Sequence, residues 1–347
     1  MTSPRPSLSS VQVPSAPAAG LPRVGIAGAT GFAGRELVRI LAGHPGVRLE
    51  TAMSSGTSGS PRALPGFARI WDGEVVPFSA DALAATDIAL LALPDAAAAG
   101  LVPGLIGAGV RVIDLSGTFR LHDVEARRRW YPDGASYAGA SVYGLTEHHR
   151  EAIRTARLVA NPGCYPTAAL VALQPLAAAG LLDGDVAVDA KSGISGAGRT
   201  PTERTHFSEC HGNVAAYGVF EHRHTPEIEQ ALGRTVTFVP HLVPLDRGLL
   251  ATSYARVRPG TTAGDIAAAF EAAYAGAPFV RVTGEALPEI KHVAHTNFCD
   301  VGWRFDAATG RLVLVSCLDN LVKGAAGQAV QNLNVMLDLD ERTGLRP

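Results

Sequence analysis

A cysteine stands at the centre of the motif NPGCYPT, which covers residues 161–167. Pro162 and Gly163 end an expected strand, and an apolar helical pattern begins immediately after Cys164. The sulfur is therefore expected at a helix N-terminus, where the partial positive charge of the helix favours thiolate over thiol. Pro166 falls within the first turn, where its missing N–H costs nothing. We predict that Cys164 is a nucleophile that attacks an activated acyl group.

The other cysteines lack such a setting. Cys210, Cys299 and Cys317 are interpreted as small apolar residues of the interior. Four cysteines without paired spacing in a chain of 347 residues are typical of free thiols in a reducing cytosol. No disulfide framework is predicted.

Two histidines that could exchange protons with the thiol, His222 and His224, lie in the sequence EHRHTPE of residues 221–227. Thr225 and Pro226 are typical of an N-cap and a first helical position, so both histidines are expected in the loop before a helix. General acid–base work is the favoured role.

Two alternatives remain open for this histidine segment. It could be a solvated charged loop, or part of a zinc site with Cys210 or His211. No clear third and fourth ligand follows in the sequence, so no metal is predicted.

A second motif, GATGFAG over residues 28–34, follows a short apolar strand and opens a helix. In that context the backbone amides at the helix N-terminus can face a pyrophosphate, and glycine lets the backbone approach it closely. The residues expected at the cofactor are Gly28, Ala29, Thr30, Gly31, Phe32, Ala33 and Gly34.

The next strand ends in Ser54 and Ser55, where an NAD enzyme usually has an acidic residue for the ribose 2′-hydroxyl. Glu50 lies near the usual distance but within the strand. Because a serine terminus accepts a 2′-phosphate more readily than a carboxylate does, NADP is favoured over NAD.

Three further segments follow predicted strands. The loop of residues 192–199, SGISGAGR, offers amides, hydroxyls and the cation of Arg199 to an anion, or is a flexible turn. Arg120 could bind a carboxylate or phosphate bidentately, or form a surface ion pair. Asn320 could bond a nicotinamide amide, or cap the last helix.

The pattern of elements that must position these residues predicts two domains. From Leu21, short apolar runs alternate with Ala- and Leu-rich helical stretches, which is typical of a doubly wound parallel α/β sheet. Its expected strands are Val24–Ala27, Val47–Met53, Ile88–Leu93, Arg111–Leu115 and Leu158–Ala160, with helices at Gly34–Gly43 and Pro94–Gly107. After a helix from Cys164 to Ala179, the runs Val186–Ala190, Thr235–Val239, Leu249–Val257 and Leu312–Leu318 indicate a mixed or antiparallel sheet in an α+β domain.

The final stretch, Lys323 to Leu337, is expected to be a helix with one buried apolar face. The predicted organisation is a disordered leader over 1–21, a dinucleotide-binding domain over 22–163 completed by 319–347, and a catalytic and oligomerisation domain over 164–318.

Composition narrows the class of partner. Lys and Arg total 30 against 32 for Asp and Glu, without basic runs, so nucleic acid is not expected. No stretch approaches the ~18 apolar residues of a membrane span. We expect a soluble, cytoplasmic protein that acts on a small molecule.

In their order along the chain, these motifs resemble the N-acetyl-gamma-glutamyl-phosphate reductase family of the arginine pathway, from about Val24 to Leu345. The resemblance rests on residues 28–34, 143–147 (YGLTE), 161–167, 192–199, 222–228, 240–244 (PHLVP), Arg247-Gly248 and 319–324 (DNLVKG). It implies a Rossmann-type domain joined to a second domain as in aspartate-semialdehyde dehydrogenase, a C-terminal helix that returns to the first domain, and a homo-oligomer, commonly a tetramer.

The resemblance also implies roles. Cys164 would displace phosphate from N-acetyl-glutamyl 5-phosphate, and NADPH would reduce the thioester to the 5-semialdehyde. His222 is slightly preferred over His224 as acid–base, and Glu227 binds substrate or orients a histidine. The remaining assignments are Ser192, Gly193, Gly196 and Asn320 to the cofactor, and Arg120, Asn161, Ser195, Arg199 and Glu227 to the substrate.

The sequence departs from the pattern of this family in several places. Thr118 stands where Asp is common, Asp95 where His is common, and His295 where Gly is usual. The alternatives are a paralogue acting on carrier-linked aminoadipyl phosphate or aspartyl phosphate, and a nucleotide-binding sensor without chemistry. The intact surroundings of Cys164 argue against the sensor.

Overall fold

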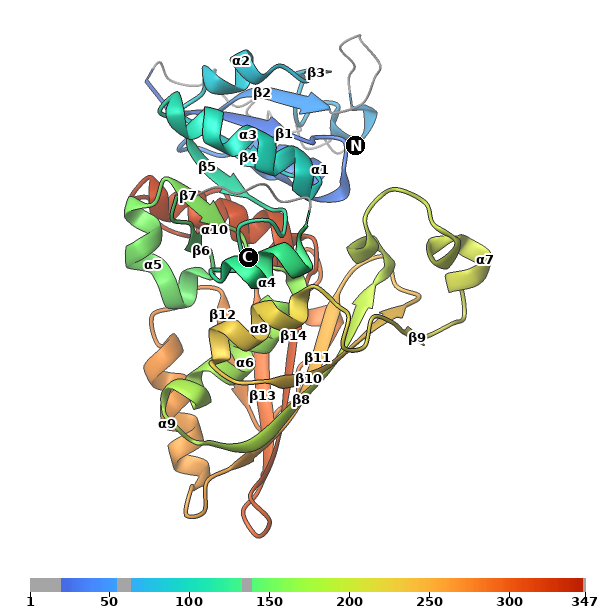
Figure 1. The fold of residues 1–347 in the computed structure, drawn as a ribbon, viewed down its shortest axis with the longest axis vertical. Coiled ribbons are helices and arrows are strands. Elements are labelled where there is room, and N and C mark those ends of the chain that lie inside the picture. Colours follow the sequence, from blue (N-terminus) through green and yellow to red (C-terminus); the bar gives the residue numbers. More distant parts are fainter. Residues whose placement is uncertain (1–19, 55–63, 133–138, 346–347) are drawn as a thin grey trace, which may run out of the picture.

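The computed structural model describes residues 20–54, 64–132 and 139–345. Most of the predicted leader, and Ser55, lie outside these residues. The described chain forms an upper part around one sheet and a lower part around another, with the last helix between them (Figure 1).

The first sheet has seven parallel strands in the order β3-β2-β1-β4-β5-β7-β6. The strands are β1 (Arg23–Ala27), β2 (Arg48–Ser54), β3 (Val75–Pro77), β4 (Ile88–Leu91), β5 (Arg111–Asp114), β6 (Val142–Tyr143) and β7 (Leu158–Ala160). The accompanying helices are α1 (Phe32–Leu41), α2 (Ala80–Ala84), α3 (Asp95–Gly107), α4 (Val124–Trp130) and α5 (Thr146–Thr155). The predicted doubly wound sheet is confirmed, and the short strands β3 and β6 are additional to the prediction.

Alternation along the central strands explains why both faces of this sheet are covered. Ile26 and Leu90 pack in one apolar cluster with α1 and the C-terminal helix, whereas their neighbours Ala27 and Leu91 pack in a second cluster with α3. Successive side chains of a strand point to opposite faces, so strands apolar at every position require cover on both sides.

The second sheet is mixed, with the order β12-β13-β14-β11-β8-β10-β9. Its strands are β8 (Leu182–Gly193), β9 (Ala215–Ala216), β10 (Val236–Val243), β11 (Leu249–Val257), β12 (Val280–Gly284), β13 (Cys299–Asp306) and β14 (Arg311–Leu318). The helices of this part are α6 (Cys164–Ala178), α7 (Phe207–Cys210), α8 (His224–Leu232) and α9 (Ala263–Tyr274). The predicted mixed sheet is confirmed, although β12 and β13 were not predicted and β8 extends beyond its expected ends.

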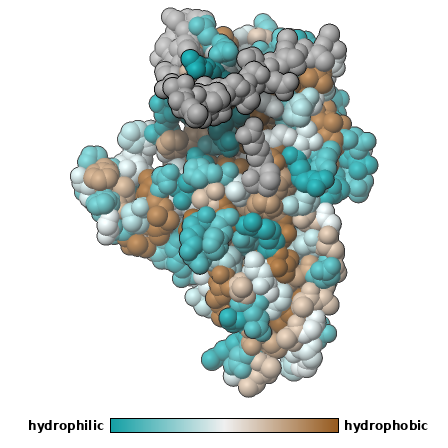
Figure 2. Space-filling model, turned by 180° about the vertical axis from the view of Figure 1, so that it is seen from behind, coloured by the Kyte–Doolittle hydropathy of each residue, from teal (hydrophilic) through white to brown (hydrophobic). Residues whose placement is uncertain are grey.

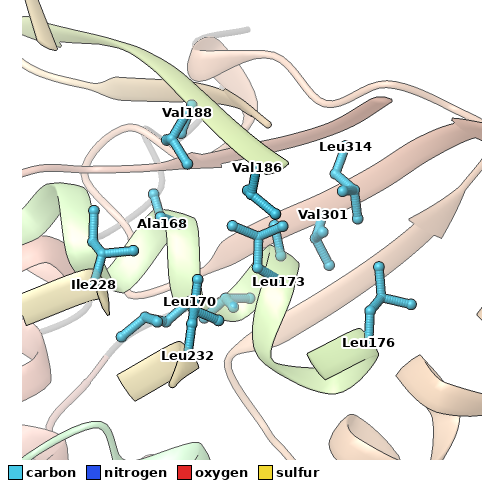
Figure 3. Packing of buried hydrophobic residues seen from close by; sticks show 14 of the residues in the cluster. Ala168, Leu170, Leu173, Leu176, Val186, Val188, Ile228, Leu232, Val301 and Leu314 are labelled. Atoms are coloured by element: carbon cyan, nitrogen blue, oxygen red, sulfur yellow. The ribbon is translucent and has the colours of Figure 1, made fainter. Parts of the chain in front are cut away.

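Helix α6 packs against one face of the second sheet. Leu170, Leu173 and Leu176 are fully buried, and Figure 3 shows them close to Val186 and Leu314. Burying such side chains contributes roughly 1.5–3 kcal/mol each. Since Cys164 is the first residue of α6, this packing fixes the helix that carries the sulfur.

The C-terminal segment differs from the prediction of a helix with one buried face. A π-helical turn (Val322–Ala326) precedes α10 (Gly327–Met336), and all ten residues of α10 are buried. Most of its polar side chains bond other parts of the protein: Gln328 and Asn332 donate to the Gly144 carbonyl, and Asn334 Oδ1 accepts from His44 Nε2. A helix buried between two parts of a protein has no solvent face, so periodicity could not indicate its setting.

One buried ion pair joins two of the motifs quoted above. Lys323 Nζ lies 2.6 Å from Glu147 Oε1, and both side chains are almost completely buried. Gln331 bonds both partners. Burial alone would raise the pKa of Glu147, but attraction to Lys323 and its hydrogen bond outweigh burial and lower that pKa.

Replacing Lys323 by Met should destabilise the protein by about 3–5 kcal/mol, because it leaves the Glu147 charge buried and unpaired. Urea denaturation near pH 7.5 measures the loss, and Lys291→Met, which breaks the exposed pair with Glu289, should change stability by less than about 1 kcal/mol. Because the pKa of Glu147 is lowered on folding, the contribution of the pair is complete above the ordinary carboxyl pKa of about 4.3 and disappears as pH falls through the lowered value. Equal losses in the two variants at pH 7.5 would contradict the interpretation.

Candidate active site

The glycines of the turn between β1 and α1 allow its backbone to pack closely against neighbouring backbone. Gly28 has φ of +89°, and a Cβ there would lie 2.1 Å from the Ala92 carbonyl oxygen. A Cβ on Gly34 would lie equally close to the Gly28 carbonyl oxygen. Only glycine fits both positions, and the turn therefore delivers the N-terminus of α1 directly into the cleft.

The start of α1 fits a dinucleotide. Gly31 is the N-cap and provides no side chain to bond the first-turn amides. Gly31, Phe32, Ala33 and Gly34 line a cavity of about 320 Å³. Helix N-terminal amides are donors suited to a pyrophosphate. Gly28, Ala29 and Thr30 lie behind this lining and shape the turn.

The end of β2 carries a serine as predicted. Ser54 is buried, and its hydroxyl lies 3.4 Å from that of Thr30. Glu50 pairs with Arg48 at 2.5 Å in the exposed part of the strand.

Cys164 lines the same cavity, at the first position of α6. The amide of its neighbour Gly163 donates to Glu227 Oε1 at 2.8 Å, and a Cβ on Gly324 would lie 2.7 Å from the Cys164 Cβ. The 319–324 motif and the 161–167 motif therefore meet at the sulfur, far apart though they are in sequence.

The predicted preference for thiolate is wrong for this structure. Burial raises the pKa of the Cys164 thiol to about 11, although the amides of Tyr165 and Cys164 and the charge of Arg120 act in the opposite direction. The helix N-terminus lowers the pKa less than desolvation raises it. An attack by this sulfur would therefore require a base to take the thiol proton.

His224 is placed for that role. It lines the cavity with Cys164, and a Cβ on Gly163 would lie 2.4 Å from His224 Nε2. Arg120 Nη1 lies 3.3 Å from the same nitrogen. A guanidinium only donates, so Nε2 is an acceptor and the neutral ring carries its proton on Nδ1. Burial, followed by the charges of His222, Arg120 and Arg223, lowers the pKa of His224 well below its ordinary value, which keeps the ring neutral.

His222 lies beside His224, with the two ring centres 4.8 Å apart, but it lines a different cavity. Its ring makes edge contacts with Tyr165, Tyr217 and Phe238, and its Nδ1 accepts the His224 amide hydrogen at 3.1 Å. It lines a second cavity, of about 740 Å³, rather than the one that holds the sulfur. Burial and the nearby Arg223 lower the pKa of His222 to about 4. The slight preference for His222 is therefore not supported by the geometry.

The start of α8 also differs from the prediction. The helix begins at His224 with Arg223 as N-cap, two residues before the expected N-cap, Thr225. His224 consequently belongs to a helix rather than to a loop, which holds its ring more rigidly.

Arg120 and Glu227 are structural anchors rather than open ligand groups. Arg120 donates to the carbonyls of Asn161 and Leu115 as well as to Glu227 at 3.3 Å. Glu227 is completely buried and also accepts from the Tyr143 hydroxyl at 2.7 Å. Arg120 reaches the cavity edge, but most of its donors are already used. The predicted bidentate grip on a substrate by Arg120, and a direct substrate contact by Glu227, do not fit this geometry.

The loop of residues 192–199 contributes unequally. Ser195, Gly196 and Arg199 line the cavity, and Arg199 donates to the Thr30 carbonyl at 2.7 Å across the cleft. Ser192 and Gly193 are buried behind it. Asn161 also lines the cavity, with its amide held by the Ala325 carbonyl.

Asn320 holds the loop in place. Its side chain accepts from the Gly248 amide and donates to Ser195 Oγ, so its predicted bond to a nicotinamide would compete with these. Capping of the C-terminal segment belongs instead to Asp319, which accepts from the amides of Leu321 and Val322.

Sequence reasoning missed the cluster around Asp319. Arg247 pairs with both Asp319 and Glu36, the latter on α1, and so ties three segments together. The Asp319 carboxylate also accepts the His295 amide at 2.6 Å. His295 has φ of +66°, which explains why glycine is usual there. The only sequence signal for this cluster was that Arg247 and Asp319 belong to the quoted motifs.

Two further findings concern the described residues. No group of three or more His, Cys, Asp and Glu side chains there could hold a metal ion. None of the helices in that part of the chain is long and apolar enough to cross a membrane.

Comparison with known proteins identifies the class of protein to which this architecture belongs. Two family models match: the semialdehyde dehydrogenase NAD binding domain over residues 23–156, and the semialdehyde dehydrogenase dimerisation domain over residues 164–320. Aspartate semialdehyde dehydrogenase II from Vibrio cholerae superposes with a TM-score of 0.71 at 20% identity, over 92% of this chain and 99% of that chain. At that identity the likeness concerns the fold. Fold and site together define an oxidoreductase of the semialdehyde dehydrogenase class with a nicotinamide dinucleotide domain.

The sequence relatives identify the family more narrowly than the fold does. The N-acetyl-gamma-glutamyl-phosphate reductase of Brevibacillus brevis is 45% identical over 337 residues, 93% of this chain and 97% of that protein. The protein of the same name from Symbiobacterium thermophilum is 47% identical over 341 residues, with the same two coverages. The chain belongs to the N-acetyl-gamma-glutamyl-phosphate reductase family.

The raised thiol pKa gives a direct test without substrate. Alkylation of Cys164 by iodoacetamide should accelerate about tenfold per pH unit from pH 7 to 10, because the thiolate fraction grows toward a pKa of about 11. Peptide mass spectrometry separates Cys164 from the partly exposed Cys210, which serves as an internal reference. A rate that levels off below pH 8 would show that the thiol is already activated at rest.

Proposed function

We propose that the chain reduces N-acetyl-glutamyl 5-phosphate with NADPH to N-acetyl-glutamate 5-semialdehyde and phosphate, in arginine biosynthesis, through a thioester on Cys164. The observation that carries this proposal is one cavity lined by Cys164, His224 and the amides that open α1. The cavity brings a nucleophile, a proton acceptor and a dinucleotide cradle together, and the chain's relatives carry the name of this reductase.

The chemistry begins with proton transfer. As the Cys164 sulfur attacks the acyl carbon, Arg120 Nη1 withdraws from His224 Nε2 and that nitrogen takes the thiol proton, which spares the cost of forming a free thiolate at a pKa of about 11. The sulfur–carbon bond forms, the carbon–oxygen bond to phosphate breaks, and the proton held by His224 neutralises the departing phosphate.

Reduction follows on the same carbon. Bound NADPH supplies a hydride to the thioester, whose carbonyl accepts hydride better than a carboxylate does. Collapse of the tetrahedral adduct expels the Cys164 sulfur and releases the aldehyde, and a solvent proton restores the thiol. His224, neutral at rest, is ready for the next cycle.

The cofactor side favours NADP. Ser54 ends β2, and the nearest acidic residue of that strand, Glu50, is occupied by Arg48. A 2′-phosphate at this end of the strand meets no opposing carboxylate there, and Ser54 and Thr30 offer hydroxyls.

The substrate is proposed to bind mainly to residues of the catalytic domain. Asn161, Ser195 and Arg199 are proposed at the acyl phosphate, and Arg199 keeps donors beyond the one given to Thr30. The 740 Å³ cavity lies next to the first and shares Gly196 with it. Its lining includes Arg204 and Asn213, which suit the carboxylate and acetamido groups of an N-acetylated amino acid.

We further infer domain bounds of 22–163 with 319–347, and 164–318. The match of residues 164–320 to a dimerisation domain supports a homo-oligomer, a dimer or tetramer. A cytoplasmic location agrees with a catalytic thiol that must remain reduced.

The activity is tested by phosphate-dependent reduction of NADP with N-acetyl-glutamate 5-semialdehyde, followed at the nicotinamide absorbance. Wild type should turn over, with NADP preferred to NAD, and Cys164→Ser should lose about 10³-fold or more, because no comparable nucleophile remains. Cys317→Ser, which changes a cysteine that lines neither cavity, is the matched control and should retain activity. A silent wild type would remove the proposed substrate, and an active Cys164→Ser would remove the thioester.

Substitution of His224 and of His222 should lower kcat by clearly different factors. His224→Asn should lower kcat about 10²–10⁴-fold, the usual contribution of a general base. His222→Asn keeps an acceptor in reach of the His224 amide and should cost much less, about tenfold at most. Steady-state kinetics of both variants decide, and a larger loss in His222→Asn would reverse the assignment.

A further inference from the structure

An ion pair crosses from the dinucleotide domain to the histidine segment. Asp95, the first residue of α3, pairs with Arg223, the N-cap of α8. The other Asp95 oxygen accepts the Gly117 amide at 2.8 Å, and its backbone carbonyl accepts the Thr118 hydroxyl at 3.0 Å. Asp95 is thus held by the loop after β5 while it binds Arg223. The two departures from the family pattern at residues 95 and 118 are in direct contact.

Arg223 is held at two further points. Its guanidinium lies 5.4 Å from the centre of the Tyr131 ring, and its backbone carbonyl accepts the Tyr131 hydroxyl at 3.3 Å. Tyr131 is buried against Gly117, where a Cβ would lie 2.0 Å from the ring. The side chain and the main chain of Arg223 are therefore both bound by the dinucleotide domain.

The position of Arg223 in the chain gives this contact its importance. It stands between His222 and His224, and His224 begins α8. Farther along the helix, Glu227 bonds the Gly163 amide, and Gln230 bonds the His122 amide and the Arg120 carbonyl. These anchors hold the middle of α8. At its histidine end, Arg223 holds the main chain, while Arg120 bonds the His224 ring.

The exposure of the two side chains indicates that this ion pair positions the histidine segment more than it stabilises the fold. The side chain of Arg223 is 58% exposed and that of Asp95 is 20% exposed. A pair so open to solvent contributes little to the free energy of folding. A general base, in contrast, loses rate steeply when it is displaced by about 1 Å.

We propose that Asp95 and Arg223 are positioning residues, which set the imidazole of His224 against the Cys164 sulfur from the dinucleotide domain. The inference rests on the proposed function, since turnover is its readout. It goes beyond that function because it makes acid–base placement depend on how the two domains are held together. Neither residue lines the cavity that holds the sulfur, and Asp95 lines neither cavity, whereas Arg223 also lines the 740 Å³ cavity, so Asp95→Asn is the variant that separates positioning from substrate binding.

The test compares Asp95→Asn, Arg223→Met and the double variant in the phosphate-dependent assay. Asn keeps the size of the side chain and an acceptor for the Gly117 amide, so only the charge is lost. Each single variant should lower kcat about tenfold with KM changed less than twofold, and the double variant should lose no more than the worse single, as expected for one shared interaction. Arg223→Lys should recover most of kcat, and melting temperatures should stay within about 2 °C of wild type.

Glu285→Gln is the matched control. It removes one charge from the exposed pair of Glu285 with Arg304, far in sequence from the site, and should leave kcat unchanged. The proposal is overturned if both single variants keep kcat within twofold of wild type, if their losses add in the double variant, or if kcat falls only in step with the melting temperature. An inactive wild type would instead defeat the proposed function, so the two failures are distinguishable.

Discussion

The buried contact between Glu227 and Arg120 is the interaction on which the site depends. Glu227 accepts hydrogen bonds from the Gly163 amide and the Tyr143 hydroxyl, while Arg120 reaches His224 and the Asn161 and Leu115 carbonyls. Burial alone would lower the pKa of Arg120, but attraction to Glu227 raises it, so Arg120 stays charged. A buried pair is costly unless all its partners are satisfied. Here that requirement forces α6, α8 and the loop after β5 into one arrangement.

The same burial determines the resting state of the catalytic groups. It raises the pKa of Cys164 and lowers that of His224, so both are neutral before substrate arrives. A neutral pair avoids two isolated charges in a poorly solvated cavity and protects the sulfur from oxidants and alkylating agents, which react with thiolate. In the proposed mechanism, proton transfer then accompanies attack rather than preceding it.

The lower part of the molecule carries a conspicuous arm, residues 199–220, which contains α7 and β9 and protrudes from the body (Figures 1 and 2). Phe207 and Phe220 are largely exposed on it. The arm also lines the 740 Å³ cavity through Arg204 and Tyr217. Its surface and the 740 Å³ cavity are thus two sides of one segment.

The sequence alone determined the elements whose causes are local. The apolar runs predicted strands, and the bounds of Leu158–Ala160 and Leu249–Val257 were predicted exactly. The glycines of residues 28–34 predicted the dinucleotide turn. Motif order predicted the family and placed Cys164 at the start of a helix. Tertiary structure alone decided which histidine lines the cavity with the sulfur, that Arg120 and Asn320 bond the protein itself, that α10 is buried on every side, and that desolvation outweighs the helix N-terminus at Cys164. Each of these outcomes depends on contacts between segments far apart in the chain, and on the solvent they exclude, which spacing along a sequence does not encode.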